Sequence, residues 1–398
     1  MNKASIRDID VRGKCVLVRV DFNVPLDHGK VADDTRLLAA LPTIRHIIDN
    51  GGRVVLMSHL GRPKGKVNAD LRLAPVAERL AILLTRPVTA LDDCVGERVE
   101  QAVKWAPPSS VMLLENLRFY AEEEKNDPAF AAQLAKLGDI YCNDAFGSAH
   151  RAHASTAGVC DHLPSYAGLL MEKEITFLGK VLHDPAHPFV SILGGAKVAD
   201  KIAVLKNLLG PVDRFIIGGG MAFTFLHVEG KKIGRSLLDP NPENARAFLE
   251  EARALGKQVL LPVDVVVAPA LADGVPTQVV SVDAIPDDMM GLDIGPRSVE
   301  RFAAALADSR TVLWNGPMGV FENPLFADGT KRLAEVVAST QATTVLGGGD
   351  TAAAAEQMGV AAKMTHISTG GGASLEFLEG RELPGVARLL DADAKVGG

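Results

Sequence analysis

Arginines recur in the first half of the chain where buried strands are expected to end. Arg62, Arg118 and Arg151 follow runs rich in Val, Ile and Leu, and Arg36 follows the first such run after a short loop. A guanidinium grips a phosphate or a carboxylate through two parallel hydrogen bonds. Because ligands sit beyond the carboxyl ends of parallel strands, these arginines predict a site for a small polyanion. The alternative is a set of unrelated surface arginines in solvent-exposed ion pairs.

Other polar side chains share these strand ends. RVDFNVP supplies Asp21 and Asn23, and SHLGRPKG supplies His59. His150 and His153 lie three residues apart, but the chain has no HExxH sequence and no third ligand beside them, so they do not predict a zinc site. No G-x-S-x-G sequence or Cys/His pairing nominates a covalent nucleophile.

The expected strands of the second half end in glycine instead. The sequences are ILGGAK, IIGGGMA, VLGGGDT and ISTGGGA. Glycine lets a backbone approach a phosphate closely, and a helix that begins just beyond it offers unpaired N–H groups to an anion. Such turns on one sheet edge predict a nucleotide site, although neither GxxxxGK[ST] nor GxGxxG is present. Tight strand-to-helix turns without a ligand are the alternative.

Several charged residues accompany the glycines. Lys197 and Lys201 are expected on one face of the first turns of a helix, where a lysine can reach a phosphate, or else are solvated. Asp350 can hold Mg²⁺ through one carboxylate, cap the following helix, or do both. Glu322, in the bent loop WNGPMGVFENP, can accept from ribose hydroxyls, but a solvated glutamate is as common there.

These residues need a parallel-sheet scaffold, which the alternation of short apolar runs and helix-like segments predicts. The fold class is therefore α/β. We expect helices at 200–209 and 241–255, and a helix in MEKEITFLGKVLHDPAHPF that ends before its prolines and marks a domain boundary. The expected strands are 15–22, 53–59, 110–114, 139–143, 189–193, 214–217, 258–267, 311–315, 343–346 and 364–367.

Length and composition set outer bounds. A chain of 398 residues with 47% hydrophobic and 23% charged residues predicts about two packed domains. A net charge of −7 disfavours a broad electrostatic hold on nucleic acid. The longest uncharged runs, 215–228 and 336–349, are shorter than the ~20 apolar residues of a membrane helix. The N-terminus shows no apolar signal region, which predicts a cytoplasmic protein. The cysteines form no CxxC and are expected to be reduced packing residues.

In order, and across essentially the whole chain, the motifs resemble those of the phosphoglycerate kinase family. They are RVDFNVP, SHLGRPKG, ENLRF, NDAFGSAHRAHAS, LGGAKVADKI, IGGGMA, GLDIGP, WNGPMGVFE, GGGDT and STGGGASLEFLEG. The resemblance implies two Rossmann-like domains. An N-terminal domain, 1–170 with the returning segment 376–398, would bind the acid substrate. An interdomain helix and hinge, 171–188, would lead to a nucleotide-binding domain at 189–375.

The resemblance also implies roles for single residues. The acid substrate would contact Asp21, Asn23, Arg36, His59, Arg62, Arg118 and Arg151. The nucleotide would contact Lys201, Gly291, Glu322, Gly348, Gly349, Asp350 and Thr351, with Asp350 toward Mg²⁺. The phosphoryl group in transit would meet Arg36, Lys197, Lys201 and the N–H groups of Gly371 and Gly372.

The implied reaction is transfer of a phosphoryl group from 1,3-bisphosphoglycerate to ADP, giving 3-phosphoglycerate and ATP, and its reverse. The acceptor in reverse is an ionised carboxylate, so no general base is required. The resemblance predicts a cytoplasmic monomer without nucleic-acid or membrane partners. Two other functions stay open on the residues alone: a nicotinamide dehydrogenase, which expects the absent GxGxxG, and a noncatalytic two-domain anion-binding protein.

Overall fold

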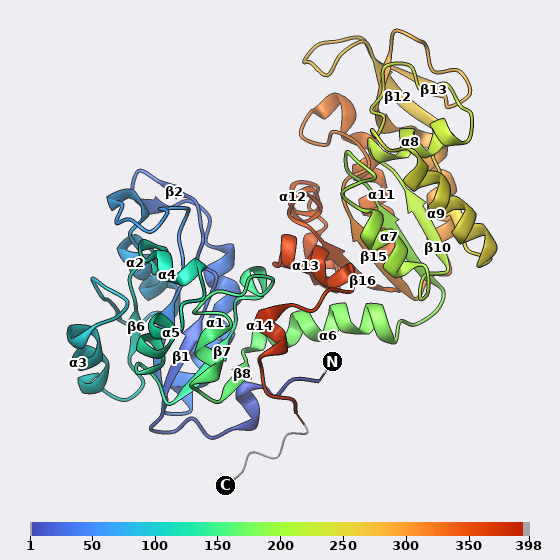
Figure 1. The fold of residues 1–398 in the computed structure, drawn as a ribbon. Helices are drawn as coiled ribbons and strands as arrows, with labels where there is room; N and C mark the ends of the chain where they lie inside the picture. The colour runs from blue at the N-terminus through green and yellow to red at the C-terminus, as the bar shows by residue number, and fades with distance from the viewer. Residues whose placement is uncertain (1, 393–398) are drawn as a thin grey trace. The chain divides into compact units, whose positions relative to one another are not determined.

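The computed structural model describes residues 2–392, and their contacts divide the chain into two units (Figure 1). Unit 1 comprises residues 1–176 and 382–398, and unit 2 comprises residues 177–381. The division falls inside helix α6, Leu169–His183, so one helix contributes residues to both units. The fold class expected from the sequence is confirmed, since each unit is built on a parallel six-stranded sheet.

Unit 1 carries the sheet β5-β6-β4-β1-β7-β8, in which every neighbouring pair is parallel. Its strands are β1 Cys15–Arg19, β4 Arg53–Met57, β5 Val88–Ala90, β6 Val111–Leu113, β7 Ile140–Asn143 and β8 Ser165–Ala167. Its helices are α1 Thr35–Asp49, α2 Ala74–Leu84, α3 Glu97–Trp105, α4 Ala121–Glu124, α5 Pro128–Ala135 and α14 Pro384–Ala387. A small hairpin joins β2, Leu26–Asp27, to β3, Lys30–Val31.

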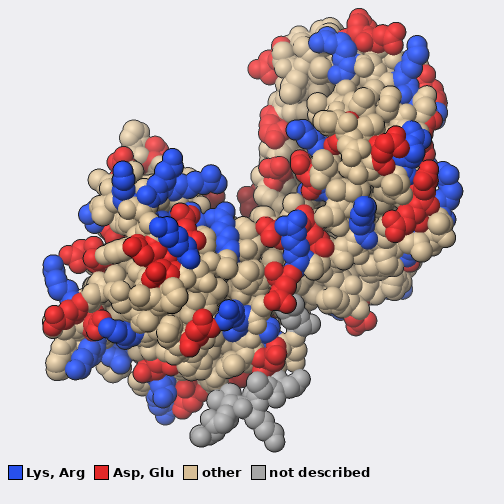
Figure 2. Space-filling view, in the orientation of Figure 1, with Lys and Arg blue, Asp and Glu red and all other residues tan. Residues whose placement is uncertain are grey.

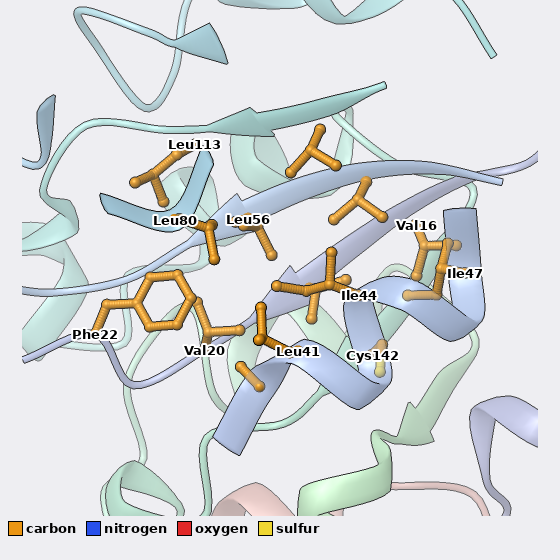
Figure 3. Close-up of a cluster of buried hydrophobic side chains, with 14 of the residues drawn as sticks. Val16, Val20, Phe22, Leu41, Ile44, Ile47, Leu56, Leu80, Leu113 and Cys142 are labelled. Carbon is orange, nitrogen blue, oxygen red and sulfur yellow. The ribbon is translucent and has the colours of Figure 1, made fainter. Parts of the chain in front are cut away.

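The core of unit 1 explains why its strands are continuous apolar runs. All five residues of β1 are buried, as expected for a strand that is covered on both faces. On one face, Val16 and Leu56 of the sheet lie in one cluster with Leu41 and Ile44 of α1 (Figure 3). This packing fixes the positions of the strand ends, from which the polar residues project.

Unit 2 carries the sheet β11-β10-β9-β15-β16-β17, which is also parallel throughout. Its strands are β9 Phe189–Leu193, β10 Arg214–Ile217, β11 Gln258–Leu260, β15 Thr311–Asn315, β16 Thr343–Gly347 and β17 His366–Ile367. Its helices are α7 Ile202–Leu208, α8 Met221–Val228, α9 Glu243–Ala254, α10 Pro296–Leu306, α11 Asp328–Ser339, α12 Gly349–Gln357 and α13 Gly372–Leu378.

An antiparallel sheet in unit 2 corrects one prediction. The single strand expected at 258–267 is wrong, because the segment splits into β11 and β12, Asp264–Ala268. Pro262 lies at the break, and proline has no N–H to give to a strand ladder. The strand β12 pairs instead with β13, Gln278–Ser281, and β14, Met290–Ile294.

The C-terminal segment from residue 382 to 392 packs within unit 1. The Ala4 N–H donates to the Leu390 carbonyl at 2.8 Å, and the Asn143 amide donates to the Gly385 carbonyl at 3.0 Å. All four cysteines are free thiols. Among residues 2–392, we find no helix whose length and apolar character would let it cross a membrane.

Candidate functional site

Two neighbouring strands of unit 1 deliver polar side chains to the same sheet edge. The strands β1 and β4 run parallel, with Arg19 beside Met57 at their carboxyl ends. Asp21 and Asn23 follow the first strand, and His59 follows the second. Because the register is fixed by the buried strands, these residues leave the sheet close together.

Arg36 reaches this edge from the first turn of α1. One of its guanidinium nitrogens, Nη1, lies 2.6 Å from the Asp21 carboxylate. The Arg36 side chain is 38% exposed and that of Asp21 is 14% exposed. Arg36 is therefore oriented by a fixed carboxylate while part of it stays open to a ligand.

His59 is buried among the arginines. Its Nδ1 lies 3.1 Å from Nη2 of Arg19. Burial lowers the pKa of His59 well below its usual value, and the positive charges of Arg19, Arg118, Arg151 and Arg36 lower it further. The ring is therefore neutral at pH 7, and Arg19 and three of the candidate arginines, Arg36, Arg118 and Arg151, lie within electrostatic reach of it.

Arg118 is the most buried of the candidate arginines. Its Nη1 donates to the Gly61 carbonyl at 2.9 Å, and its Nε lies 3.3 Å from Glu124. Burial lowers the pKa of Arg118, Glu124 raises it, and the charges of Arg151 and Arg19 lower it again. Like charges are held close together here, as a site prepared for a polyanion requires.

The remaining candidates of unit 1 lie around these groups. The Asn23 side-chain oxygen accepts from the Gly61 N–H at 2.9 Å, which ties the two loops together. Arg62 follows directly and is exposed. Nε of Arg151 donates to the His150 ring at 3.1 Å. Figure 2 shows Lys and Arg side chains gathered on the upper part of unit 1 in this view.

Sequence reasoning noted Arg19 only as a polar residue at a strand end and missed the buried polar group in unit 1 to which it belongs. Arg19 and Glu123 have no exposed surface, and Ser155 lies between them. The signal for Arg19 was present, since it is a charged residue at the end of the apolar run CVLVRV. No local signal marked Glu123 or Ser155, because their partners are distant in the sequence.

Unit 2 contains a cavity of about 470 Å³. Gly291, Glu322 and Asp350 line it, together with apolar side chains that include Phe223 and Met290. A Cβ atom on Gly291 would lie 2.0 Å from Cζ of Phe223, so only glycine fits at this point of the wall. An apolar cavity with a few carboxylates at its margin suits a flat base joined to a polar sugar and phosphates.

Two helices of unit 2, α12 and α13, begin at glycines, and α12 reaches the cavity through Asp350. Gly348 precedes α12 with φ +91°, and Gly371 precedes α13 with φ +52°, both in the region that favours glycine. Gly349 and Gly372 begin the two helices, where backbone N–H groups have no partner within the helix. Thr351 is buried, and its hydroxyl accepts from the Gly316 N–H at 2.7 Å.

The lysines are not placed as predicted. The expectation that Lys197 and Lys201 share a helix face is wrong, since α7 begins at Ile202 and turns precede it. The chain turns there because the Ala199 N–H donates to the Asp239 carboxylate at 2.9 Å. Lys197 is exposed.

Lys201 is half-buried, and its amine donates to the Asn315 side-chain oxygen. Burial lowers its pKa, while the negative charges of Asp200 and Asp350 raise it. The amine therefore lies within electrostatic reach of the helix α12 that carries Asp350.

The residues also fit a nucleotide-borne Mg²⁺. Within residues 2–392 no group of three or more His, Cys, Asp or Glu side chains could hold a metal ion. Mg²⁺ on a nucleotide needs only one or two carboxylates, since phosphate oxygens and waters complete its shell. Asp350 is exposed beside the cavity and supplies one such carboxylate.

Comparisons with known proteins agree with one another. The model of the phosphoglycerate kinase family matches residues 6–381. The phosphoglycerate kinase of Moorella thermoacetica is 57% identical over 392 residues, which cover 98% of this chain and 100% of that protein. That of Dictyoglomus turgidum is 54% identical over 388 residues, or 97% and 98% of the two chains.

Solved structures give the same result. The phosphoglycerate kinase from Coxiella burnetii matches with a TM-score of 0.90 at 40% identity, covering 97% of this chain and 98% of that one. The enzyme from Pyrococcus horikoshii matches with a TM-score of 0.80 at 34% identity and the same coverage.

Proposed function

This chain belongs to the phosphoglycerate kinase family, and from that membership we propose how its two units share the reaction. The reaction is the reversible, ATP-dependent phosphoryl transfer of glycolysis. It converts 1,3-bisphosphoglycerate and ADP into 3-phosphoglycerate and ATP, and it runs backwards in gluconeogenesis. The residue roles below are our proposal.

The acid substrate is assigned to the arginine cluster of unit 1. The proposed contacts are Asp21, Asn23, Arg36, His59, Arg62, Arg118 and Arg151. The observation that carries this assignment is the convergence of several arginines on one buried, neutral histidine. Guanidinium groups from separate loops can hold a carboxylate and a phosphate of one small molecule at once.

The nucleotide is assigned to the cavity of unit 2 and its glycine turns. The base and ribose would occupy the space lined by Gly291 and Glu322. The phosphates would lie at Gly348, Gly349 and Thr351, with Lys201 beside them. Asp350 would hold Mg²⁺, which neutralises phosphate charge when it is bound.

Catalysis follows from charge stabilisation and positioning. In the transition state the transferring phosphoryl group carries charge on three equatorial oxygens. The groups proposed to face these oxygens are Arg36, Lys197, Lys201 and the N–H groups of Gly371 and Gly372. Both nucleophiles, a phosphate oxygen forward and a carboxylate in reverse, are already ionised at neutral pH. No side chain has to remove a proton. We also propose that the protein acts as a cytoplasmic monomer.

A coupled assay tests the function. The purified protein is mixed with 3-phosphoglycerate and MgATP, and a dehydrogenase reports the 1,3-bisphosphoglycerate formed. We expect turnover that requires both substrates. A folded protein without turnover would overturn the proposal, and retained anion binding would then favour a noncatalytic protein. A fluorescence titration with NADH separately tests the dehydrogenase alternative, for which we expect no binding.

A further inference from the structure

A chain of buried polar side chains lies beneath the arginine cluster of unit 1, and the mechanism above does not use it. It begins at Glu123 in α4, which has no exposed surface. One carboxylate oxygen accepts from the Ser155 N–H at 3.0 Å, and the other accepts from the Ser155 hydroxyl at 2.5 Å. The His153 ring lies 3.8 Å from the second oxygen, and burial lowers the pKa of that ring to about 4, so it is neutral.

The next link has only one possible direction. A serine hydroxyl has a single proton, and Ser155 gives it to Glu123, so its oxygen is left to accept. Nε of Arg19 donates to that oxygen at 2.8 Å. Nη1 of Arg19 donates to the Val20 carbonyl, which leaves Nη2 directed at the His59 ring. Arg19 is thus held at three points.

The last link determines the tautomer of His59. A guanidinium has five donors and no acceptor, so Nδ1 of His59, 3.1 Å from Nη2 of Arg19, must be an acceptor. The proton of the neutral ring is therefore on Nε2. The positive charges around the ring oppose a second proton. His59 then offers a ligand one N–H donor and no charge.

We propose that Glu123 and Ser155 are positioning residues that, through Arg19, hold His59 as the neutral Nε2–H tautomer, ready to donate to an oxygen of the acid substrate. The proposal rests on the proposed function in one respect, namely that the acid substrate binds at this cluster. In this tautomer His59 donates one hydrogen bond in a fixed direction, so it binds only a ligand atom that can accept a hydrogen bond. Charge alone does not give this selectivity. The surrounding arginines supply the charge.

The tautomer is measured directly by long-range ¹H–¹⁵N spectra of the full chain labelled at histidine nitrogen. A His59→Gln variant, which removes one set of signals, assigns the resonances. We expect His59 at pH 7 to show one protonated nitrogen, Nε2, and one unprotonated nitrogen, Nδ1. A doubly protonated ring or the Nδ1–H tautomer would overturn the proposal.

We call the hydrogen bonds that lead from Glu123 through Ser155 and Arg19 to His59 the relay. It is tested with Ser155→Ala, which leaves Nε of Arg19 without its partner. We expect mixed His59 tautomers and a KM for 3-phosphoglycerate raised by about 10-fold, with the KM for ATP unchanged. Ser165→Ala is the matched control, because it removes another buried hydroxyl of unit 1, whose partners are the Leu163 carbonyl and the Cys160 thiol and not the residues that lead to His59. We expect it to change neither readout.

A Ser155→Ala protein with an unaltered His59 spectrum and unaltered KM would show that the relay has no positioning role. Should that variant not fold, Arg19→Lys gives the same readouts, since one ammonium cannot hold Ser155, Val20 and His59 together. If the His59 signals fail to shift when 3-phosphoglycerate is added, the substrate assignment is wrong. The tautomer spectra without ligand test the relay independently of that assignment.

Discussion

Charged side chains at both candidate sites are held by partners that a ligand could replace. Asp21 holds Arg36, and Asn315 holds the amine of Lys201. These contacts keep each cation in a defined place without neutralising it by full burial. Preorganised charge of this kind is worth most where charge develops during the reaction. The prediction for Arg36 follows from this arrangement.

Arg36→Ala should lower kcat by roughly 10² or more, since one preorganised charge toward the transferring phosphoryl group is lost. Arg79→Ala is the matched control, because Arg79 also pairs with an aspartate, Asp34, and is 40% exposed. Steady-state kinetics in the coupled assay provide the measurement. An Arg36 variant with raised KM and unchanged kcat would restrict this residue to binding.

Asp350→Asn should weaken the Mg²⁺ dependence of nucleotide use and leave the affinity for 3-phosphoglycerate unchanged, since the two ligands are assigned to different units. Asp328→Asn, in the first turn of α11, serves as the control. Isothermal titration with each ligand, with and without Mg²⁺, gives both affinities. Equal loss of both would argue that the units are wrongly assigned.

At the scale of elements, two contacts position helices against the ends of strands near the candidate sites. Phe223 in α8 packs against Gly291 in β14 so closely that no side chain fits between them. Asp144, just beyond β7, accepts from the N–H groups of Leu170 and Met171 at the start of α6, at 2.9 and 3.2 Å. Each contact is a point where a small substitution should have a defined effect.

Gly291→Ala should raise the KM for ATP without changing that for 3-phosphoglycerate. The added Cβ would lie 2.0 Å from Cζ of Phe223 and would displace that ring in the wall of the cavity. Gly210→Ala is the control, because a Cβ there meets no atom within 4 Å. If the two alanine variants have the same KM for ATP, the cavity does not hold the nucleotide.

Asp144→Asn should remove the unfavourable free energy of ionising a buried carboxyl group, which grows as the pH rises. Burial raises the pKa of Asp144 to about 6, above the ~3.9 of an unfolded aspartate, so the folded state binds more protons in between. Its contribution to stability is present below about pH 4 and is lost as the pH rises through 6. From pH 4 to pH 7, the variant should therefore gain up to about 3 kcal/mol relative to the native chain.

Urea unfolding of both proteins at several pH values measures this difference in the free energy of unfolding. If the free energies of unfolding of the two proteins differ by the same amount at every pH between 4 and 7, Asp144 does not ionise in that range. The same comparison shows whether asparagine still caps α6, since loss of the cap lowers stability equally at every pH.

At the scale of the whole molecule, the assigned ligands belong to different units. Reacting atoms must come within about 3–3.5 Å, and water must be excluded from the phosphoryl group. We therefore predict that the units close on each other when both ligands are bound, with hinges at the ends of α6 and near residues 370–372. Each ligand contacts mainly its own unit, so the pair is needed to favour the closed state.

Small-angle X-ray scattering checks this prediction. The radius of gyration should fall more with 3-phosphoglycerate and a nonhydrolysable MgATP analogue together than with either alone. Equal radii in the free, singly bound and doubly bound protein would contradict the hinge, even if the enzyme assay succeeds.

The sequence by itself determined the fold class, most strands of both parallel sheets and the arginines or glycines that follow several of them, but it did not indicate the edge strands β5 and β8. The features that it determined are local: buried strands are continuous apolar runs, and the arginine or glycine that follows a strand needs only its neighbours to be recognised. The family motifs added the substrate. The antiparallel sheet was missed because the short segments β13 and β14 show their pairing only once they meet β12.

Only the tertiary structure decided how distant side chains are paired. Lys201 precedes its helix because of turns that depend on Asp239, and no spacing in the sequence indicates that contact. Arg19 meets Ser155 across 136 positions of sequence. Such hydrogen bonds form between groups that packing brings together in a low-dielectric interior, and their direction follows from which atoms can donate. The tautomer of a histidine at the site is thereby a property of the folded chain alone.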